Sequence, residues 1–418
     1  MSQLRLPLAL SLVAVLLAAG SAGSAETPAE PTHLEIAVWY DGAASDLGPL
    51  NDLTWSFQQR HPSVVVSLRR RATLTAYPLL QQWALDPASA PDLTVISSTW
   101  LPQFQASFAS LDAAAQSDAG RKITPSVWSL FTTGGQVKAV PWGVAARVLL
   151  IRSDLLQAKH LQAPENWDQV LALLPGLSSP PQVYAIGLPG ARAGGGAALL
   201  QEMIWAEGDS LVGAEGAVDL TAPAKLKALT NFCALAHAAQ PEVLSWTQNE
   251  LESAFAAGRV GMVFSDTWAA RGLKGATGVP AYQVLPLPRG ASEAQHIMGD
   301  GLAVMAKGKS VALATEFAQF ILTASAQEKL VAWGGLPVQQ DLVKKSADPL
   351  LTTLLPTLTT ARLSPPGQPV ALANALDYAI YLAVSGRSAP AEALAAAEEM
   401  LRGTVTPPAT GAPTGVEK

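Results

Sequence analysis

Cysteine, histidine and charged side chains are scarce in this chain of 418 residues. The single cysteine, Cys233, excludes an intrachain disulfide and a cysteine metal cluster, and its apolar neighbours predict a buried, inert thiol. The five histidines are scattered without the spacing of metal ligands, so we expect no metal and no other cofactor. Charged residues make up 14% of the chain and the formal net charge is −6, which argues against a nucleic-acid partner.

Short catalytic motifs are also missing. The sequence has no Gly-x-Ser-x-Gly elbow, no His-Glu-x-x-His zinc motif and no nucleotide-type glycine fingerprint. The glycine-rich stretch 190–196 lacks the Lys-Ser/Thr ending of a phosphate loop and is interpreted as a flexible connection. We therefore expect a protein that is not an enzyme.

Long apolar runs are absent after the N-terminus. Residues 1–25 combine Arg5, an apolar stretch from Leu6 to Ala19 and a small-residue ending, which predicts a cleaved secretory signal peptide. No later segment offers about 18 uncharged apolar residues in a row, so no membrane span is expected. Because no cysteine stands near the cleavage site, we expect no lipid anchor and a location in the periplasm or outside the cell.

The rest of the sequence alternates strand and helix patterns. Apolar, β-branched runs predict strands, and the helix patterns between them end at proline or glycine. This alternation predicts an α/β fold with mostly parallel sheets flanked by helices. The predicted strands are 34–39, 64–68, 92–96, 137–140, 147–152, 184–188, 259–264, 282–285 and 302–305. The predicted helices include 51–60, 79–85, 102–115, 251–257, 315–324, 326–333, 350–358, 369–385 and 390–401, and residues 404–418 predict a disordered tail.

Tryptophan is abundant, with eleven in all, and several follow a predicted strand directly. In an open α/β sheet, ligands bind in the crevice beyond the carboxyl ends of the strands. An indole there offers an apolar plate and one N–H donor, which suits the C–H face and the hydroxyl rim of a sugar ring. For Trp39, Tyr40 and Trp100, packing against the core stays an equal alternative. The candidate aromatic groups are Trp39, Tyr40, Trp100, Trp142, Trp268 and Trp333, with Trp205 as a weaker one, whereas Trp55, Trp83, Trp128, Trp167 and Trp246 are predicted to pack.

Four charged residues near these aromatics are candidates for binding hydroxyl groups, because ionised groups make the stronger hydrogen bonds. Asp41 precedes a glycine and could instead be a turn residue. Asp266 could cap the segment after it, and Asp300 could belong to a tight turn between two glycines. Arg147 could clamp a hydroxyl or a carboxylate, or form an ion pair with Asp154 or another acid.

Three sequence blocks follow one another along the chain. They are Val140-Pro141-Trp142-Gly143 with 148–156 and 163–168, then Phe255 to Trp268, and then Gly299-Asp300-Gly301 with Gly334-Gly335-Leu336-Pro337. In this order they resemble the family-1 extracellular solute-binding proteins of ABC transporters, the group that includes maltodextrin-binding proteins. Asp300 departs from that family, which often has a second glycine there, and we expect it to put a carboxylate into the cleft.

The resemblance implies two α/β lobes joined by hinge strands, with the ligand between them. It implies a first lobe of residues 26–140 and 282–330 and a second of residues 141–281 and 331–403. It also implies a periplasmic, monomeric protein that captures a sugar or oligosaccharide and delivers it to an ABC permease in the inner membrane. Two alternatives stay open: a different small solute, such as glycerol phosphate, a polyamine or an organic acid, and a secreted carbohydrate-active hydrolase with two aspartates as acid and base.

Overall fold

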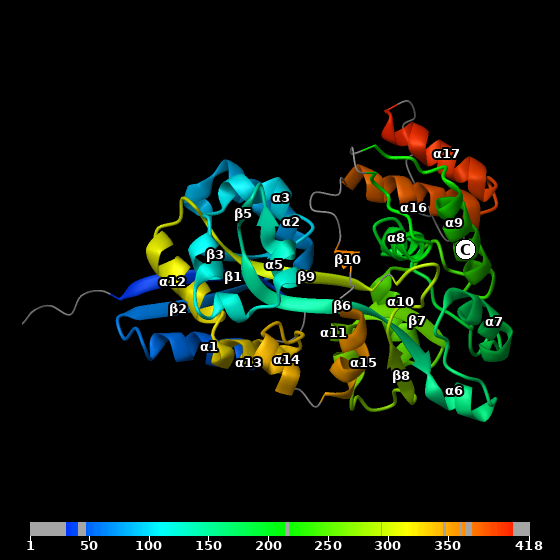
Figure 1. Cartoon of the computed structure of the whole chain (residues 1–418), viewed down its shortest axis with the longest axis horizontal. Helices are drawn as coiled ribbons and strands as arrows, with labels where there is room; N and C mark the ends of the chain where they lie inside the picture. Colours follow the sequence, from blue (N-terminus) through cyan, green and yellow to red (C-terminus); the bar gives the residue numbers. More distant parts are fainter. Residues whose placement is uncertain are drawn as a thin grey trace, which may run out of the picture.

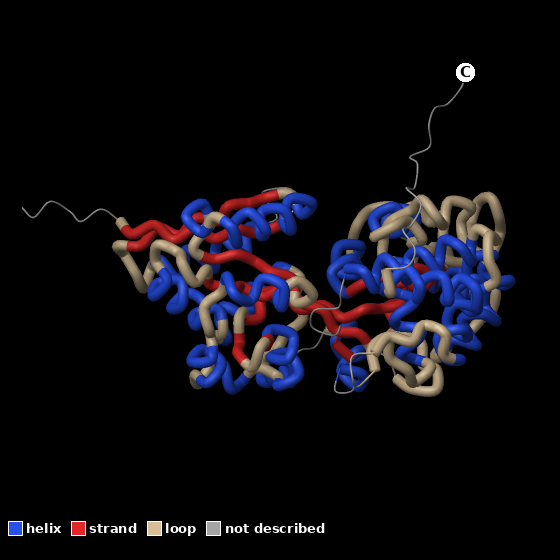
Figure 2. The backbone as a smooth tube through the Cα atoms, turned by 90° about the horizontal axis from the view of Figure 1, so that it is seen from above, coloured by secondary structure: helices blue, strands red, loops and turns tan. Residues whose placement is uncertain are grey.

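Two lobes joined by long strands make up the protein (Figure 1). The computed structural model describes residues 31–40, 47–213, 217–293, 295–345, 348–358, 362–363 and 370–403. Seen from above, helices surround both lobes and strands run between them (Figure 2). The buried apolar residues form one cluster in the first lobe and two in the second, so each lobe has its own core.

Three parallel strands in the order β2-β1-β3 form the base of the first lobe. They are β1 (Thr32–Trp39), β2 (Val64–Arg71) and β3 (Leu93–Ser97). The edge strand β2 alternates buried and exposed side chains, whereas β3 is buried over its first four residues, as expected for an inner strand. The surrounding elements are α1 (Gly48–Gln58), α2 (Ala76–Leu85), α3 (Leu101–Phe104), α4 (Asp112–Gln116), α5 (Pro125–Phe131), β4 (Thr132–Thr133), β5 (Gln136–Val137), α12 (Val311–Ile321) and α13 (Ala324–Trp333), with short 3-10 helices at 73–75, 87–89, 105–107 and 120–122.

The strands β6 (Val140–Arg152) and β9 (His296–Val304) run from one lobe to the other (Figure 1). The first half of β6 pairs antiparallel with β9, and β9 in turn pairs antiparallel with β3. The second half of β6 pairs with β7 (Met262–Asp266) and β8 (Tyr282–Leu285). Every side chain of β6 is buried, which explains why its sequence is almost continuously apolar. The lobes therefore share two strands, and a hinge motion would bend them.

Helices lie around the strands of the second lobe in the view of Figure 1. Its central helix, α8 (Gly196–Ala206), is buried at nearly every position, and it packs beside Leu149 and Ile151 of β6. The other elements are α6 (Ser153–Ala158), α7 (Trp167–Leu177), α9 (Pro223–His237), α10 (Gln248–Ala256), α11 (Thr267–Leu273), α15 (Pro349–Leu358), α16 (Val370–Val384) and α17 (Pro390–Leu401), with α14 (Gln340–Lys345) and β10 (Arg362–Leu363) in the connecting segments.

The observed contacts differ from the predicted division into lobes at two places. β8 pairs with β6 at Leu149–Arg152, and Leu287 lies in the core of the second lobe, so this segment packs with the second lobe and not the first. Val338 lies in the core of the first lobe and Trp333 packs against it, although both were assigned to the second. The chain returns to the first lobe along β9, and we propose that it leaves again between Val338 and Leu351, which belongs to a second-lobe cluster.

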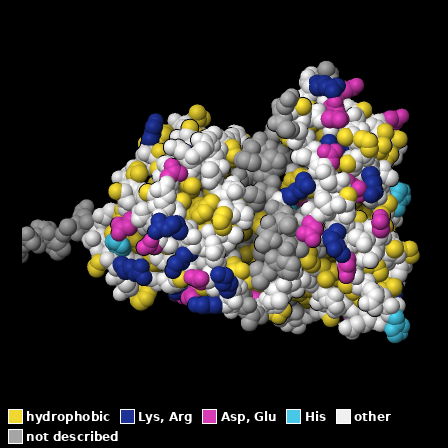
Figure 3. Space-filling view, in the orientation of Figure 1, with side chains coloured by type: hydrophobic (Ala, Val, Ile, Leu, Met, Phe, Trp, Pro, Cys, Tyr) yellow, Lys and Arg dark blue, Asp and Glu magenta, His cyan; other side chains and the backbone are white. Residues whose placement is uncertain are grey.

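The described surface carries charges of both signs. Acidic and basic side chains are interspersed over the described part of the face in Figure 3, without one large patch of either sign. Within the described ranges, no helix combines the length and the apolar character that a membrane crossing requires.

Candidate functional site

Three glycines, one in β6 and two directly after α13, leave room for the indole of Trp268. A Cβ atom added to Gly334 would lie 2.5 Å from Cε3 and Cζ3 of the ring, and one added to Gly143 would lie 3.1 Å from Cζ2. A Cβ atom on Gly335 would lie 3.8 Å from Cζ2. Gly143 belongs to β6 and Gly334 follows α13, so the ring rests against a strand that both lobes share. The three sequence blocks that carried the resemblance thus meet at this ring.

The sharp turn from β7 into α11 fixes the position of Trp268. Oδ1 of Asp266 accepts hydrogen bonds from the backbone N–H groups of Trp268, at 2.8 Å, and Ala269, at 3.0 Å. Asp266 is therefore the N-cap of α11, as the structural alternative for this residue predicted. Its side chain remains half-exposed, and a ligand contact by the same carboxylate stays a prediction.

Four aromatic residues, Tyr40, Trp142, Trp268 and Trp333, form what we call the aromatic cluster. Trp333 contacts each of the other three. Its ring centroid lies 5.0 Å from that of Trp268, 6.4 Å from that of Trp142 and 6.0 Å from that of Tyr40. The interplanar angles of 74°, 67° and 57° are those of edge-to-face or tilted pairs, which aromatic rings prefer. Trp142 is only 3% exposed, so it serves as packing, although its Nε1 has no hydrogen-bond partner among the described residues. The other three rings are half-buried and could offer part of their surface to a ligand.

Asp300 lies on β9 between Ser97 of β3 and Gly143 of β6. Cross-strand neighbours project from the same face of a sheet, so Asp300 is on the face where Trp268 rests over Gly143. Its side chain is exposed, yet the surrounding protein removes part of its water and raises the pKa of Asp300 to about 6, and the negative charge of Asp266 adds to the rise. The residue is part of a strand, so the tight-turn alternative is wrong.

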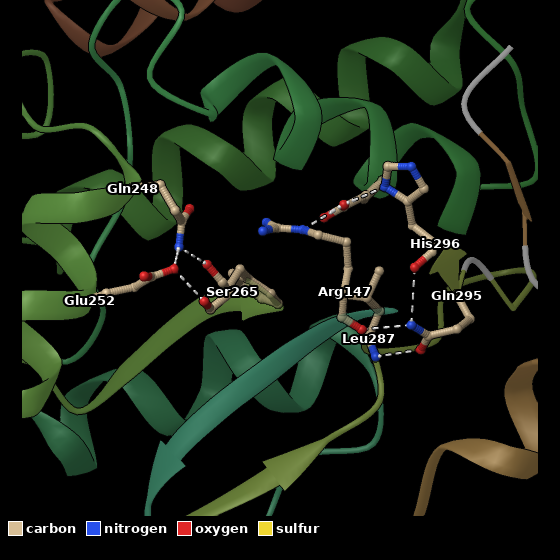
Figure 4. A network of polar contacts seen from close by, with 9 residues as sticks. Arg147, Gln248, Glu252, Ser265, Leu287, Gln295 and His296 are labelled. Atoms are coloured by element: carbon tan, nitrogen blue, oxygen red, sulfur yellow. Dashed lines mark hydrogen bonds and ion pairs between the residues drawn. The ribbon is translucent and has the colours of Figure 1, made fainter. Parts of the chain in front are cut away.

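Arg147 is held by a buried acid (Figure 4). Its Nε donates to Oε1 of Glu202 at 2.9 Å, and Nδ1 of His296 lies 2.9 Å from the same oxygen. The side chains of Arg147 and Glu202 are 7% and 1% exposed. Asp154 pairs instead with Arg152. Arg147 therefore fulfils the ion-pair alternative, with a partner that the sequence did not indicate, and we leave it out of the proposed site.

Two other predicted aromatic groups lie in the first lobe. The Nε1 of Trp39 donates to the backbone oxygen of Val95 at 2.7 Å, and its ring stacks on Trp83 at a centroid distance of 5.8 Å. Trp39 is thus used for packing. Trp100 precedes α3, is half-buried and lies edge-on to Tyr77 at 5.4 Å, so it keeps both a packing contact and some free surface.

The remaining predictions from the sequence concern residues that the structure does not place at this site. Asp41 lies outside the described residues. Trp205 is buried in the core of the second lobe, edge-on to His296. Trp55 was expected to pack but is 60% exposed, because the buried face of α1 runs through neighbouring positions instead. Cys233 is half-buried, and desolvation raises the pKa of its thiol to about 11, which fits an unreactive group.

Sequence reasoning missed several polar residues beside the site. Ser97 ends β3 and Thr99 follows it, and their hydroxyl oxygens lie 3.0 Å apart. The rule that selected aromatics after strands would have found them if it had included hydroxyl groups. On α10, Glu252 accepts hydrogen bonds from the Ser265 hydroxyl at 2.6 Å and from Gln248 Nε2 at 3.1 Å (Figure 4), and burial raises its pKa. No local pattern pointed to this group.

Among the residues that the structure describes, no three His, Cys, Asp or Glu side chains are close enough together to hold a metal ion. The absence of a cofactor stays a prediction from the sequence.

Replacing Asp300 with Asn should stabilise the protein at neutral pH and not at acidic pH. The pKa of Asp300 is about 6 in the folded state against an ordinary value of 3.8, so ionisation of the native carboxyl lowers stability as the pH rises from about 4 to 6. Since the side chain is exposed, solvent screening limits the gain to less than about 1 kcal/mol. Thermal unfolding of both proteins at pH 4 and pH 7.5 measures it. Equal differences at both pH values would contradict the assignment.

Gly334→Ala should displace the indole of Trp268. The new methyl group would overlap a ring carbon at 2.5 Å, and the backbone φ of +136° is unfavourable for alanine. We expect a shifted tryptophan emission maximum and a loss of stability of roughly 1–3 kcal/mol. Gly275→Ala is the matched control, because Gly275 also has a positive φ, of +79°, but no atom lies within 4 Å of its added Cβ. If both variants show the same emission maximum and the same stability in urea unfolding, the close contact between Gly334 and the Trp268 ring is contradicted.

Comparison with known proteins agrees with this architecture. The chain matches the family model of bacterial extracellular solute-binding proteins over residues 77–353. A protein of Brucella abortus named as a binding protein is 24% identical over 325 residues, which cover 73% of this chain and 78% of that one. A solute-binding protein of an ABC transporter from Thermotoga lettingae, bound with alpha-D-tagatose, superimposes with a TM-score of 0.79 at 19% identity, covering 89% of this chain and 99% of that one. Maltose-bound MalE3 of T. maritima gives a TM-score of 0.78 at 18% identity, covering 90% of this chain and 100% of that one. The protein belongs to the family of bacterial extracellular solute-binding proteins.

Proposed function

We propose that the protein is the substrate-binding component of an ABC importer, that it works as a monomer in the periplasm, and that it delivers a captured sugar or oligosaccharide to a membrane permease. The observation that carries the proposal is the half-buried indole of Trp268, which rests against Gly143, on a strand that both lobes share, and against Gly334, which follows α13. A flat apolar ring with acidic groups beside it matches the C–H face and the hydroxyl groups of a sugar.

In this proposal each group has a separate role. The Trp268 ring stacks on the sugar, and Trp333 and Tyr40 bound the same space from the first lobe. The carboxylate of Asp300 accepts hydrogen bonds from hydroxyl groups. A ligand that touches both lobes favours the closed state, because it gains contacts there that the open state lacks. β6 and β9 would bend during closure.

Ligands of similar proteins support a hydroxylated solute. The two structures compared above hold tagatose and maltose, and others of similar fold hold ribitol and D-mannitol. These chains are 18–20% identical to this one, so they suggest a class of ligand and not a particular sugar.

Titration of intrinsic tryptophan fluorescence with a panel of mono- and oligosaccharides tests the proposal. A cognate sugar should produce a saturable change, since Trp268 and Trp333 would lose water on binding. No response to any sugar, together with a clear response to a peptide or an organic acid, would overturn it.

Glycoside hydrolysis is the second candidate, and one observation favours it. Asp300, with its raised pKa, and Asp266 form a pair of nearby carboxyl groups, as an acid and a base would. However, the hydrogen bonds of Asp266 to the α11 backbone already give it a structural task. Release of nitrophenol from chromogenic glycosides decides between the two, and we expect none.

A further inference from the structure

We propose that the captured solute carries a positive charge, a protonated amine on a hydroxylated compound such as an amino sugar, and that this charge lies against the Trp268 indole between Asp266 and Asp300. The proposal rests on the proposed function and narrows its class of ligand. It starts from one juxtaposition, an indole ring with two carboxylates near it.

Asp300 flanks the ring from the sheet. It is the cross-strand partner of Gly143, and paired side chains have their Cβ atoms about 5 Å apart. The Trp268 ring lies 3.1 Å from the Cβ position of that same glycine. A group resting on the indole is therefore within reach of the Asp300 carboxylate.

Asp266 flanks the ring from the start of α11. Both hydrogen bonds that the described backbone makes to its side chain go to Oδ1, from Trp268 and Ala269. The carboxylate is half-exposed, so its other oxygen can accept from a ligand. The two acids act on each other, because the charge of Asp266 helps to raise the pKa of Asp300.

The nearest basic groups of the sheet do not neutralise this pair. Arg147 is the cross-strand partner of Asp266, but its Nε is held at 2.9 Å by Glu202, so that buried pair brings no net charge. Arg71 ends β2, three strands from β9, which at about 4.8 Å per strand puts it roughly 14 Å from Asp300. That separation exceeds the Debye length of about 8 Å at physiological ionic strength.

Closure around a neutral sugar would give the two carboxylates hydrogen bonds from hydroxyl groups but no counter-charge, so part of the cost of burying their charges would remain. A protonated amine offsets that cost with charge-assisted hydrogen bonds, and it interacts favourably with the face of an indole. A metal ion fits less well, because its usual third ligand is missing among the described His, Cys, Asp and Glu side chains and because an indole cannot coordinate it.

Calorimetric titration with D-glucose, 6-amino-6-deoxy-D-glucose, its N-acetylated derivative and spermidine tests the proposal at pH 7 and low salt. We expect the amino sugar to bind about tenfold more tightly than glucose or the acetylated compound, and the preference to shrink as salt is added. Asp300→Asn and Asp266→Asn should each reduce the preference, and asparagine at 266 keeps the N-cap. Asp52→Asn, on the exposed surface of α1, is the control and should keep it.

The possible outcomes distinguish failure of this proposal from failure of the proposed function, which is sugar binding. If glucose binds as tightly as the amino sugar and neither site variant changes the ratio, the charge proposal is overturned while sugar binding stands. If spermidine binds and no sugar does, sugar binding is overturned while the cationic site stands. If none of the four compounds binds, the charge proposal is overturned, and the fluorescence titration with the full sugar panel decides the proposed function.

Discussion

Arg147→Met should lower the free energy of unfolding by about 3–5 kcal/mol, because it leaves a buried carboxylate without its counter-charge. Glu202 is 1% exposed on its side chain, and Arg147 and His296 both lie 2.9 Å from its Oε1. Burial alone would raise the pKa of Glu202, but the charge of Arg147 and the hydrogen bonds from both partners outweigh it, and the pKa lies below its ordinary 4.5. Stability from this group is thus present at neutral pH and is lost as the pH falls below 4.5. Urea unfolding followed by circular dichroism at pH 7 measures the change.

Arg289→Met is the matched control for this prediction. Arg289 pairs with Glu165 at 2.8 Å, but the side chains are 57% and 71% exposed, so its removal should cost less than about 1 kcal/mol. The double variant Arg147→Met with Glu202→Leu should recover much of the loss, since an apolar pair of similar volume needs no counter-charge. Comparable losses in Arg147→Met and Arg289→Met would contradict the role assigned to the buried pair.

The same residue shows where sequence reasoning reached its limit. Arg147 stood out as a charge in an apolar strand, and an ion pair was one of two interpretations. Its partner Glu202 lies 55 residues further on, inside an apolar helix, and the third member, His296, is further still. Nothing local links these residues, because the packing of α8 over two strands brings them together.

Local patterns predicted the elements well where the signals were local. Residues 390–401 form a helix with the predicted bounds, since a proline begins it and apolar positions recur along it. By contrast, two strands were predicted at 137–140 and 147–152, whereas the structure has a two-residue strand, β5, at Gln136–Val137 and one long strand, β6, over Val140–Arg152. Pro141 and Gly143 lie near the start of β6, and a register shift between them accommodates both residues within the strand. The helix predicted over 102–115 is interrupted, because Phe108 has an extended backbone.

Sheet direction and lobe boundaries depend on long-range pairing. The strand–helix alternation predicted parallel strands, and β2-β1-β3 are parallel. The strands shared by the lobes pair antiparallel, which no periodicity reveals. Only part of the site could be predicted from the sequence. Trp268 and Trp333 could be selected because one lies in, and the other directly before, sequence blocks that resemble a family in order. Ser97 and Glu252 lie beside the site only through sheet register and packing.

Trp268→Ala should weaken binding of the solute by about 30- to 1,000-fold, or roughly 2–4 kcal/mol, if the proposed function holds. The substitution removes the plate that rests over Gly143 and Gly334 and the edge-to-face contact with Trp333. Calorimetric titration with the best ligand of the sugar panel measures the loss, and Trp268→Phe should recover part of it because a smaller ring can still stack.

Trp55→Ala is the control for this prediction. It shows whether removing a tryptophan outside the site affects binding. Trp55 is 60% exposed on α1 in the first lobe, so its removal should leave affinity and melting temperature unchanged. A melting curve of Trp268→Ala shows whether the lobes still fold, because the empty seat beside Gly334 costs packing as well as ligand contact. A variant that melts as a folded protein and binds the solute with native affinity would remove Trp268 from the site, and the carboxylates near it would lose the surface that makes them a site.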